Sequence, residues 1–178
     1  LNELRAAGAA DRPDDVELLD VTRMCNGLVQ TFAEYAETHK VGYRTEVGEG
    51  MLFPSARGTL SMVLNIVLSN AFRRSETGGE VFFGVSVVQD RLRVVVSNRG
   101  EGVDLGQIEF LSDRYRLLDY LESRGKGGLS QKGDMELAIC HNLAAKLGGE
   151  FRIASEGDVT TVTLSFPELE IARVTQPV

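Results

Sequence analysis

The sequence has little cysteine and histidine and no tryptophan: two cysteines and two histidines occur in 178 residues. Cys25 and Cys140 lie far apart in predicted helices, which favours two buried thiols in a reducing compartment over a disulfide. Basic residues are too few to balance the acidic ones, and the net charge of −7 argues against binding to nucleic acid. No apolar run approaches the roughly 18 residues of a membrane span, and no signal peptide is visible. We therefore expect a cytoplasmic domain.

The chain has the composition of one ordinary globular domain, with 43% hydrophobic and 25% charged residues. It begins at Leu1 rather than at methionine, so we interpret it as a piece of a longer protein whose upstream part could hold a membrane anchor. We expect residues 1–15 to be the tail of an upstream dimerisation helix with its linker. Residues 16–167 should then form the domain, and residues 168–178 a tail.

The hydrophobic pattern alternates between a helical period and a strand period. It predicts helices over 16–38, 56–74 and 135–147, and strands over 41–47, 51–53, 80–88, 91–97, 150–154 and 159–166. A tight hairpin turn is expected at Gln89-Asp90, and a helix end at Gly148-Gly149. The segment 100–132 is harder to assign: it holds a possible helix over 110–121 followed by a polar, glycine-rich stretch typical of a functional loop.

This order of elements predicts an α+β fold. Hairpin-linked strands favour a mixed, mostly antiparallel sheet, and three helices with one apolar face each would cover one side of it. The expected architecture is therefore a two-layer α/β sandwich.

One helix carries a distinctive motif. Residues 65–75 read NIVLSNAFRRS, and they resemble the motif N-L-L-x-N-A-x-K-[YF]-[TS] of the ATP-binding catalytic domain of sensor histidine kinases. The resemblance covers residues 16–167 and implies the Bergerat-type fold of the GHKL ATPase superfamily. It assigns Asn70 to the Mg²⁺ that bridges the phosphates of ATP, since a neutral amide oxygen suits this hard cation. It assigns Arg73 to the phosphates. Without the family pattern, the same residues would be a local cap and a solvated arginine pair.

A second motif follows a predicted strand. Residues 98–102 read NRGEG and resemble the family's D-x-G-x-G, which implies that Asn98, Gly100 and Gly102 contact adenine. Asn98 replaces the aspartate that accepts a hydrogen bond from the adenine amino group. A neutral acceptor in place of a charged one should cost about 1–2 kcal/mol, or roughly tenfold in affinity.

The third motif departs further from the family. The pattern G-x-G-L-G-L-A-I, in which glycine amides hold phosphate, aligns with KGDMELAI at residues 132–139. Lys132, Asp134 and Glu136 stand at the three glycine positions, and Asp134 could instead cap the helix that follows. An alternative is that nearby glycines let the loop take another shape and supply other amides: Gly125, Gly127, Gly128 and Gly133. A carboxylate about 4 Å from a phosphate charge is repelled by about 4 kcal/mol at an effective dielectric near 20. Residues 110–117 resemble, more loosely, the phenylalanine-containing segment that precedes the ATP lid; a surface helix would read the same way.

The resemblance implies the ATP-binding catalytic domain of a two-component sensor histidine kinase, with ATP and Mg²⁺ as cofactors and with nucleotide binding weakened or lost. An active protein would be an ATP-dependent protein-histidine kinase. Its phosphoacceptor and dimerisation domain would lie upstream, so this fragment would hold no catalytic residue. A response regulator receiver domain would be its partner, and the full-length protein a homodimer.

Two alternatives remain open from the sequence. One is a non-catalytic pseudokinase or histidine phosphotransferase-like scaffold that docks a response regulator. The other is a serine-kinase-type anti-sigma factor, which the dimerisation-helix character of residues 1–15 disfavours.

Overall fold

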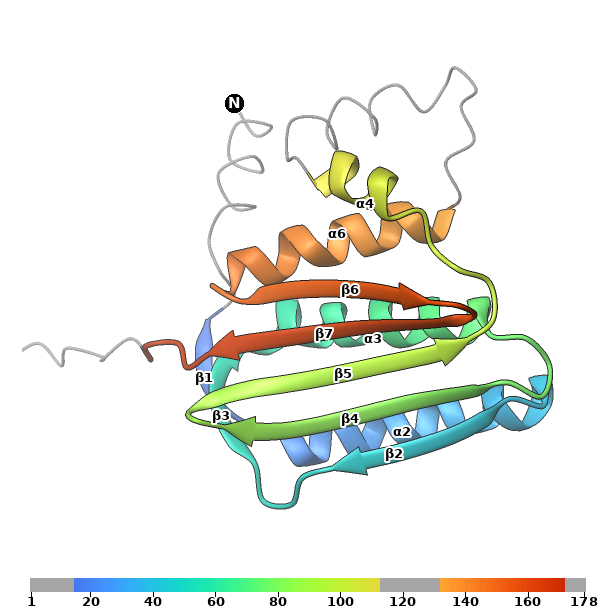
Figure 1. The fold of residues 1–178 in the computed structure, drawn as a ribbon. Coiled ribbons are helices and arrows are strands. Elements are labelled where there is room, and N and C mark those ends of the chain that lie inside the picture. The colour runs from blue at the N-terminus through green and yellow to red at the C-terminus, as the bar shows by residue number, and fades with distance from the viewer. Residues whose placement is uncertain (1–14, 113–131, 172–178) are drawn as a thin grey trace, which may run out of the picture.

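The computed structural model describes residues 15–112 and 132–171. Figure 1 shows the order of elements along the chain. The strands are β1 (Val16–Asp20), β2 (Gly42–Val47), β3 (Leu52–Ala56), β4 (Glu80–Val88), β5 (Arg91–Arg99), β6 (Glu150–Glu156) and β7 (Val159–Pro167). The helices are α2 (Val21–His39), α3 (Arg57–Arg74), α4 (Leu105–Ser112) and α6 (Lys132–Lys146).

Five of these strands form one sheet in the order β2-β4-β5-β7-β6. The β2–β4 pair is parallel and the other three pairs are antiparallel, which confirms the predicted mixed sheet. Gln89 and Asp90 join β4 to β5 with φ values of 51° and 58°, and two positive values in succession are the signature of a type I′ hairpin turn.

Helices α2, α3 and α6 lie on one face of the sheet, as predicted, and the core lies between the two layers (Figure 1). Alternate residues of β4, β5 and β7 point into this core, while their neighbours face outward. The sheet therefore has one buried and one solvated face, the arrangement expected of an antiparallel sheet in two layers. The fully buried large side chains of the sheet and of α3 include Phe83, Leu92, Leu164, Phe166, Leu60, Leu64, Leu68 and Phe72.

The prediction of a helix from residue 16 is wrong, because Val16–Asp20 forms β1 and pairs with β3. Leu18 is 56% exposed and Leu19 is fully buried, so the apolar residues alternate in burial as they do in a strand. The helix α2 begins only at Val21, where the Asp20 side chain accepts a hydrogen bond of 2.9 Å from the Arg23 amide.

The strand expected over 51–53 extends further, because β3 runs from Leu52 to Ala56 and includes Pro54 opposite Leu18. A two-stranded ribbon tolerates proline because one side of each strand needs no partner. The Pro54 carbonyl is used on that free side: it accepts a hydrogen bond of 3.0 Å from the Leu169 amide.

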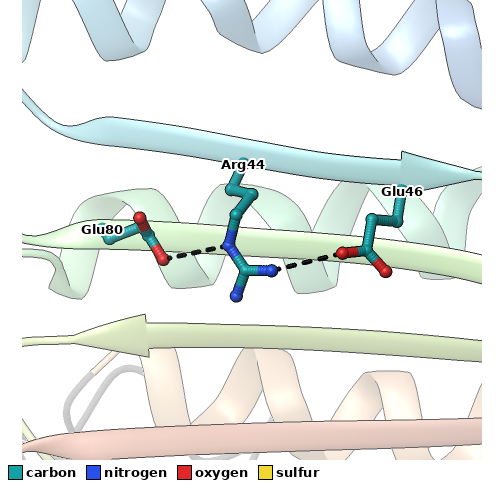
Figure 2. A network of polar contacts seen from close by, with 3 residues as sticks. All are labelled: Arg44, Glu46 and Glu80. Atoms are coloured by element: carbon teal, nitrogen blue, oxygen red, sulfur yellow. Dashed lines mark hydrogen bonds and ion pairs between the residues drawn. The ribbon is translucent and has the colours of Figure 1, made fainter.

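A small polar network lies on the outer face of the sheet, at the edge strand β2 (Figure 2). Arg44 donates to Glu46 at 3.3 Å and to Glu80 at 3.4 Å, and its guanidinium lies 4.3 Å from the Phe82 ring centre. The Phe82 ring in turn covers Gly84, where an added Cβ would lie 2.8 Å from the ring. The charged groups are more than half exposed, so their ion pairs add little stability, but charge on an edge strand opposes pairing with another chain.

The segment assigned with difficulty is only partly described. Helix α4 covers Leu105–Ser112, and most of the helix expected over 110–121 lies outside the described residues. Helix α6 starts at Lys132 rather than at residue 135, so Asp134 lies within its first turn and does not precede it as a cap. The expected helix end is confirmed: α6 stops at Lys146, and Gly148 has a φ of 67°.

Both cysteines are free and fully buried, in α2 and α6 respectively, as the sequence indicates. Burial raises the pKa of each thiol to about 12. Among the helices within residues 15–112 and 132–171, none is both long and apolar enough to cross a membrane.

Candidate functional site

The residues predicted to bind nucleotide lie on three elements that meet over one end of the sheet. Asn70 and Arg73 belong to the last turns of α3, Asn98 to the end of β5, and Gly100 and Gly102 to the segment after it. An isolated bridge between Ser75 and Gly100 joins the end of α3 to the end of β5. The first turns of α6, which include Gly133, face α3 from the other side, as the contact described below between Arg73 and α6 shows.

Asn70 lies on the buried side of α3 and is 4% exposed. The other asparagine of the motif behaves differently: Asn65 is exposed, and its amide donates to the Ser61 carbonyl one turn earlier at 2.9 Å. The structure therefore separates the two asparagines of the motif, because only Asn70 lies on the side of α3 that packs inward.

Arg73 is engaged within the protein. Its Nε donates to the Ser69 carbonyl at 3.3 Å, and its terminal nitrogen forms an ion pair with Glu136 of α6. The two side chains are 37% and 22% exposed, so this pair is only partly screened by water. The negative charge that Glu136 places at this glycine position of the third motif is thus matched by the positive charge of Arg73.

Gly100 has a structural task at the junction of α3 and β5. A Cβ added there would lie 2.0 Å from the Arg74 carbonyl oxygen, far inside van der Waals contact. This close approach allows the next amide, that of Glu101, to donate to the same carbonyl at 3.0 Å. The contact that requires glycine here is therefore made with the protein's own backbone.

Gly102 lies in a more open position. The only neighbour that an added Cβ would meet among the described residues is the Ser155 hydroxyl, at an ordinary 3.7 Å. Its carbonyl accepts a hydrogen bond of 2.5 Å from the guanidinium of Arg74, which is 8% exposed. The local alternative, in which both arginines of the motif are solvated, is therefore wrong for Arg74, which is buried and holds the 100–102 segment.

Asn98 and Thr160 form a buried polar pair on the helix-covered face of the sheet. They are opposite each other on β5 and β7, and they are 4% and 3% exposed. Neither the Asn98 Nδ2 nor the Thr160 Oγ1 has a hydrogen-bond partner among the described residues. Leaving a buried polar atom unpaired costs about 1–3 kcal/mol, so such atoms in a native protein call for an explanation.

The unpaired atoms have the chemistry to hold a flat heterocycle. A hydroxyl both donates and accepts, and rotating the asparagine amide by half a turn exchanges its oxygen and nitrogen. Together they can match one donor and one acceptor on the edge of a purine. By contrast, the described residues contain no cluster of three histidine, cysteine or acidic side chains that could hold a metal alone.

Sequence reasoning missed two members of this arrangement. Thr160 had a usable signal, because it shares a strand face with the buried Val162, Leu164 and Phe166 and is the one hydroxyl among them. The ion pair of Arg73 with Glu136 had no local signal, since the partners are far apart in the chain.

Comparison with known proteins identifies the family. The family described as "Histidine kinase-, DNA gyrase B-, and HSP90-like ATPase" matches residues 56–170. The chain is 27% identical over 169 residues to the sensor-like histidine kinase SenX3 of Mycolicibacterium smegmatis, covering 94% of this chain and 43% of that protein. It is 26% identical over 157 residues to the sensor histidine kinase WalK of Bacillus subtilis, covering 86% of this chain and 25% of that protein. The chain thus spans less than half the length of these relatives.

Solved structures share the fold. The full-length histidine kinase ShkA in complex with AMPPNP matches with a TM-score of 0.69 at 19% identity, over 93% of this chain and 34% of that one. The histidine kinase ThkA in complex with the response regulator protein TrrA matches with a TM-score of 0.68 at 15% identity, over 86% and 42%. At these identities the likeness establishes the architecture, which is that of a histidine kinase catalytic domain.

Proposed function

The chain belongs to the family of histidine kinase-, DNA gyrase B- and HSP90-like ATPases, as a catalytic domain of the sensor histidine kinase type, and on that basis we propose where and how it binds ATP. The proposed site lies between α3 and α6, above the ends of β5 and β7. Its base pocket is formed by Asn98, Thr160 and Gly102, and its phosphate region by Asn70, Arg73 and Gly133.

The buried pair Asn98 and Thr160 is the observation that carries the proposal. A bound adenine supplies both partners that these side chains lack, since its amino group donates and its ring nitrogens accept. Gly102 lies in the segment that follows β5, and there is room beside it, because an added Cβ would make only an ordinary contact with the described residues. Because Asn98 is neutral, we expect weaker base binding than a carboxylate would give.

The phosphate region fits a magnesium ion that is held mainly by the nucleotide. Mg²⁺ prefers oxygen ligands and keeps phosphate and water among them, so one amide oxygen from Asn70 suffices on the protein side. When bound, the ion would neutralise charge on the phosphates during transfer. The first turn of α6 would add backbone amides and the positive end of a helix dipole near Gly133.

The wider role follows the relatives. We propose that the domain works within a sensor histidine kinase on the cytoplasmic side, where it transfers the ATP γ-phosphoryl group to a histidine of an upstream dimerisation domain. A response regulator receiver domain would take the phosphoryl group from that histidine, and the full-length protein would be a homodimer. Residues 1–15 would form the connection to the upstream domain.

The test is a titration of the 178-residue chain with a fluorescent ATP analogue and Mg²⁺, compared with Asn70→Ala and with Asn65→Ala. Asn65 is the matched control, because the same change is made on the same helix but at an exposed position. We expect saturable binding that Asn70→Ala weakens about tenfold or more by removing the metal ligand, and that Asn65→Ala leaves unchanged.

Two results would contradict the proposal. Absence of binding at millimolar nucleotide would favour the non-catalytic scaffold. Equal effects of the two asparagine substitutions would mean that Asn70 acts through helix stability rather than through the metal.

A further inference from the structure

An ion pair between Arg73 and Glu136 links helix α3 to helix α6. Arg73 donates from its Nε to the Ser69 carbonyl and from one terminal nitrogen to the Glu136 carboxylate, so two of its three guanidinium nitrogens are engaged within the protein. A guanidinium fork recognises a phosphate with the same planar pair of donors that it offers to a carboxylate.

We propose that Glu136 is an internal competitor of phosphate: its carboxylate occupies Arg73 until the triphosphate of ATP displaces it. This inference rests on the proposed nucleotide site. It adds a specificity-determining role for a residue that stands where the family has glycine. The ion pair then governs how strongly the phosphate chain is held, while Asn98 and Thr160 govern how strongly the base is held.

The partial burial of the pair makes this competition measurable. At 37% and 22% exposure, the two charges interact more strongly than a fully solvated pair, and separating them leaves a carboxylate close to incoming phosphate. The protein therefore loses one attraction and gains one repulsion when a triphosphate enters. A ligand without phosphate disturbs neither charge, so its affinity should not depend on Glu136.

The experiment measures binding of Mg²⁺-ATP and of adenosine to the unaltered 178-residue chain and to Glu136→Gln. The glutamine keeps the size of the side chain and removes its charge. Glu37→Gln provides the matched control, because it removes one negative charge from an exposed position on α2. Thermal melting of each variant establishes that it is folded.

We expect Glu136→Gln to raise the affinity for Mg²⁺-ATP about tenfold and to leave the affinity for adenosine unchanged. Any gain in ATP affinity caused by Glu37→Gln should be smaller. In an Arg73→Gln background the same substitution should have a smaller effect, because no guanidinium is released and only the repulsion between the carboxylate and the phosphates is relieved.

The outcomes separate this inference from the proposed function. If the unaltered chain binds Mg²⁺-ATP and Glu136→Gln binds it equally well or more weakly, the competitor role is wrong and the nucleotide site stands. If adenosine gains as much affinity as ATP, Glu136 acts on the base pocket and the inference is also wrong. If neither protein binds ATP or adenosine at millimolar concentration, the proposed function itself is wrong.

Discussion

Replacing Gly100 by alanine should damage the junction between α3 and β5 more than any nearby change of similar size. The new Cβ would lie 2.0 Å from the Arg74 carbonyl oxygen, 2.9 Å from the Glu76 nitrogen and 3.0 Å from the Arg74 carbonyl carbon. All three atoms belong to the backbone, so no side chain can turn away to relieve the contact. The Cβ and the oxygen have to move apart by at least about 1 Å.

The cost can be estimated from the hydrogen bonds that cross this junction. The Glu101 amide donates to the Arg74 carbonyl at 3.0 Å, and the Glu76 amide donates to the Arg99 carbonyl at 3.3 Å. Weakening two such bonds at about 1 kcal/mol each, and adding residual strain, gives a loss of about 3 kcal/mol in the free energy of unfolding. For a chain of this length, the melting temperature should fall by roughly 6–12 °C.

Gly102→Ala is the matched control, two positions further along the same segment. Within the part of the chain that the structure describes, its Cβ would meet only the Ser155 hydroxyl, at 3.7 Å, and alanine lowers the entropy of the unfolded chain. We expect thermal unfolding, followed by circular dichroism, to give a melting temperature for Gly102→Ala equal to or slightly above that of the unaltered chain. Its affinity for adenine nucleotide should fall, because the methyl group projects where the base is expected.

The reasoning would be refuted if Gly100→Ala melted within 2 °C of the unaltered chain, a difference that corresponds to only about 0.5–1 kcal/mol. It would also be refuted if the alanine at residue 102 caused the larger loss of stability. Either result would mean that the close approach of the two backbones is not what requires glycine at residue 100.

Three further predictions concern a buried hydroxyl and the two buried thiols. Thr160→Val removes an unpaired buried hydroxyl, so the melting temperature of the nucleotide-free domain should stay unchanged or rise. The same substitution should weaken nucleotide binding about fivefold to tenfold. A clear loss of stability would show that the hydroxyl has a partner. Cys25 and Cys140 should resist iodoacetamide at neutral pH until the domain unfolds, since burial raises the pKa of each thiol from 9.0 to about 12. Above pH 9 the thiols ionise in the unfolded state but not in the folded state, so the free energy of unfolding should fall by roughly 1.4 kcal/mol per pH unit for each thiol until about pH 12. Chemical denaturation at several pH values measures this fall. Rapid labelling of the native protein would show that the thiols are not buried and would contradict both thiol predictions.

Much of the fold was predictable because its elements have clear local signals. The spacing of Leu60, Leu64 and Leu68 indicates the buried face of α3, and the Gln89-Asp90 turn fixes the β4–β5 hairpin. The failure at residues 16–20 has a physical reason as well. A short run with adjacent leucines fits the hydrophobic period of a helix as well as that of a strand. Pairing with β3 makes it a strand, and β3 comes later in the chain, after α2 and β2.

The candidate site was predictable only in part. Motif resemblance selected Asn70, Asn98, Gly100 and Gly102, and the structure brings the elements that carry them together. It could not indicate that Gly100 serves the backbone of α3. The ion pair between Arg73 and Glu136 could not be predicted either, because spacing along the chain does not show that α3 and α6 pack against each other.

The parallel β2–β4 pair has a consequence for how the domain assembles. Strands β4 and β5, and likewise β6 and β7, are joined by short turns, and such hairpins form within microseconds from local contacts. Residues 48–79 connect β2 to β4 and include all of α3, so the two strands can pair only after this long connection has folded. Closing so long a loop costs chain entropy, which makes the step slow. The helix that carries Asn70 and Arg73 is therefore also the link that completes the sheet, so a chain arrested before this step would have its hairpins but no place for a nucleotide.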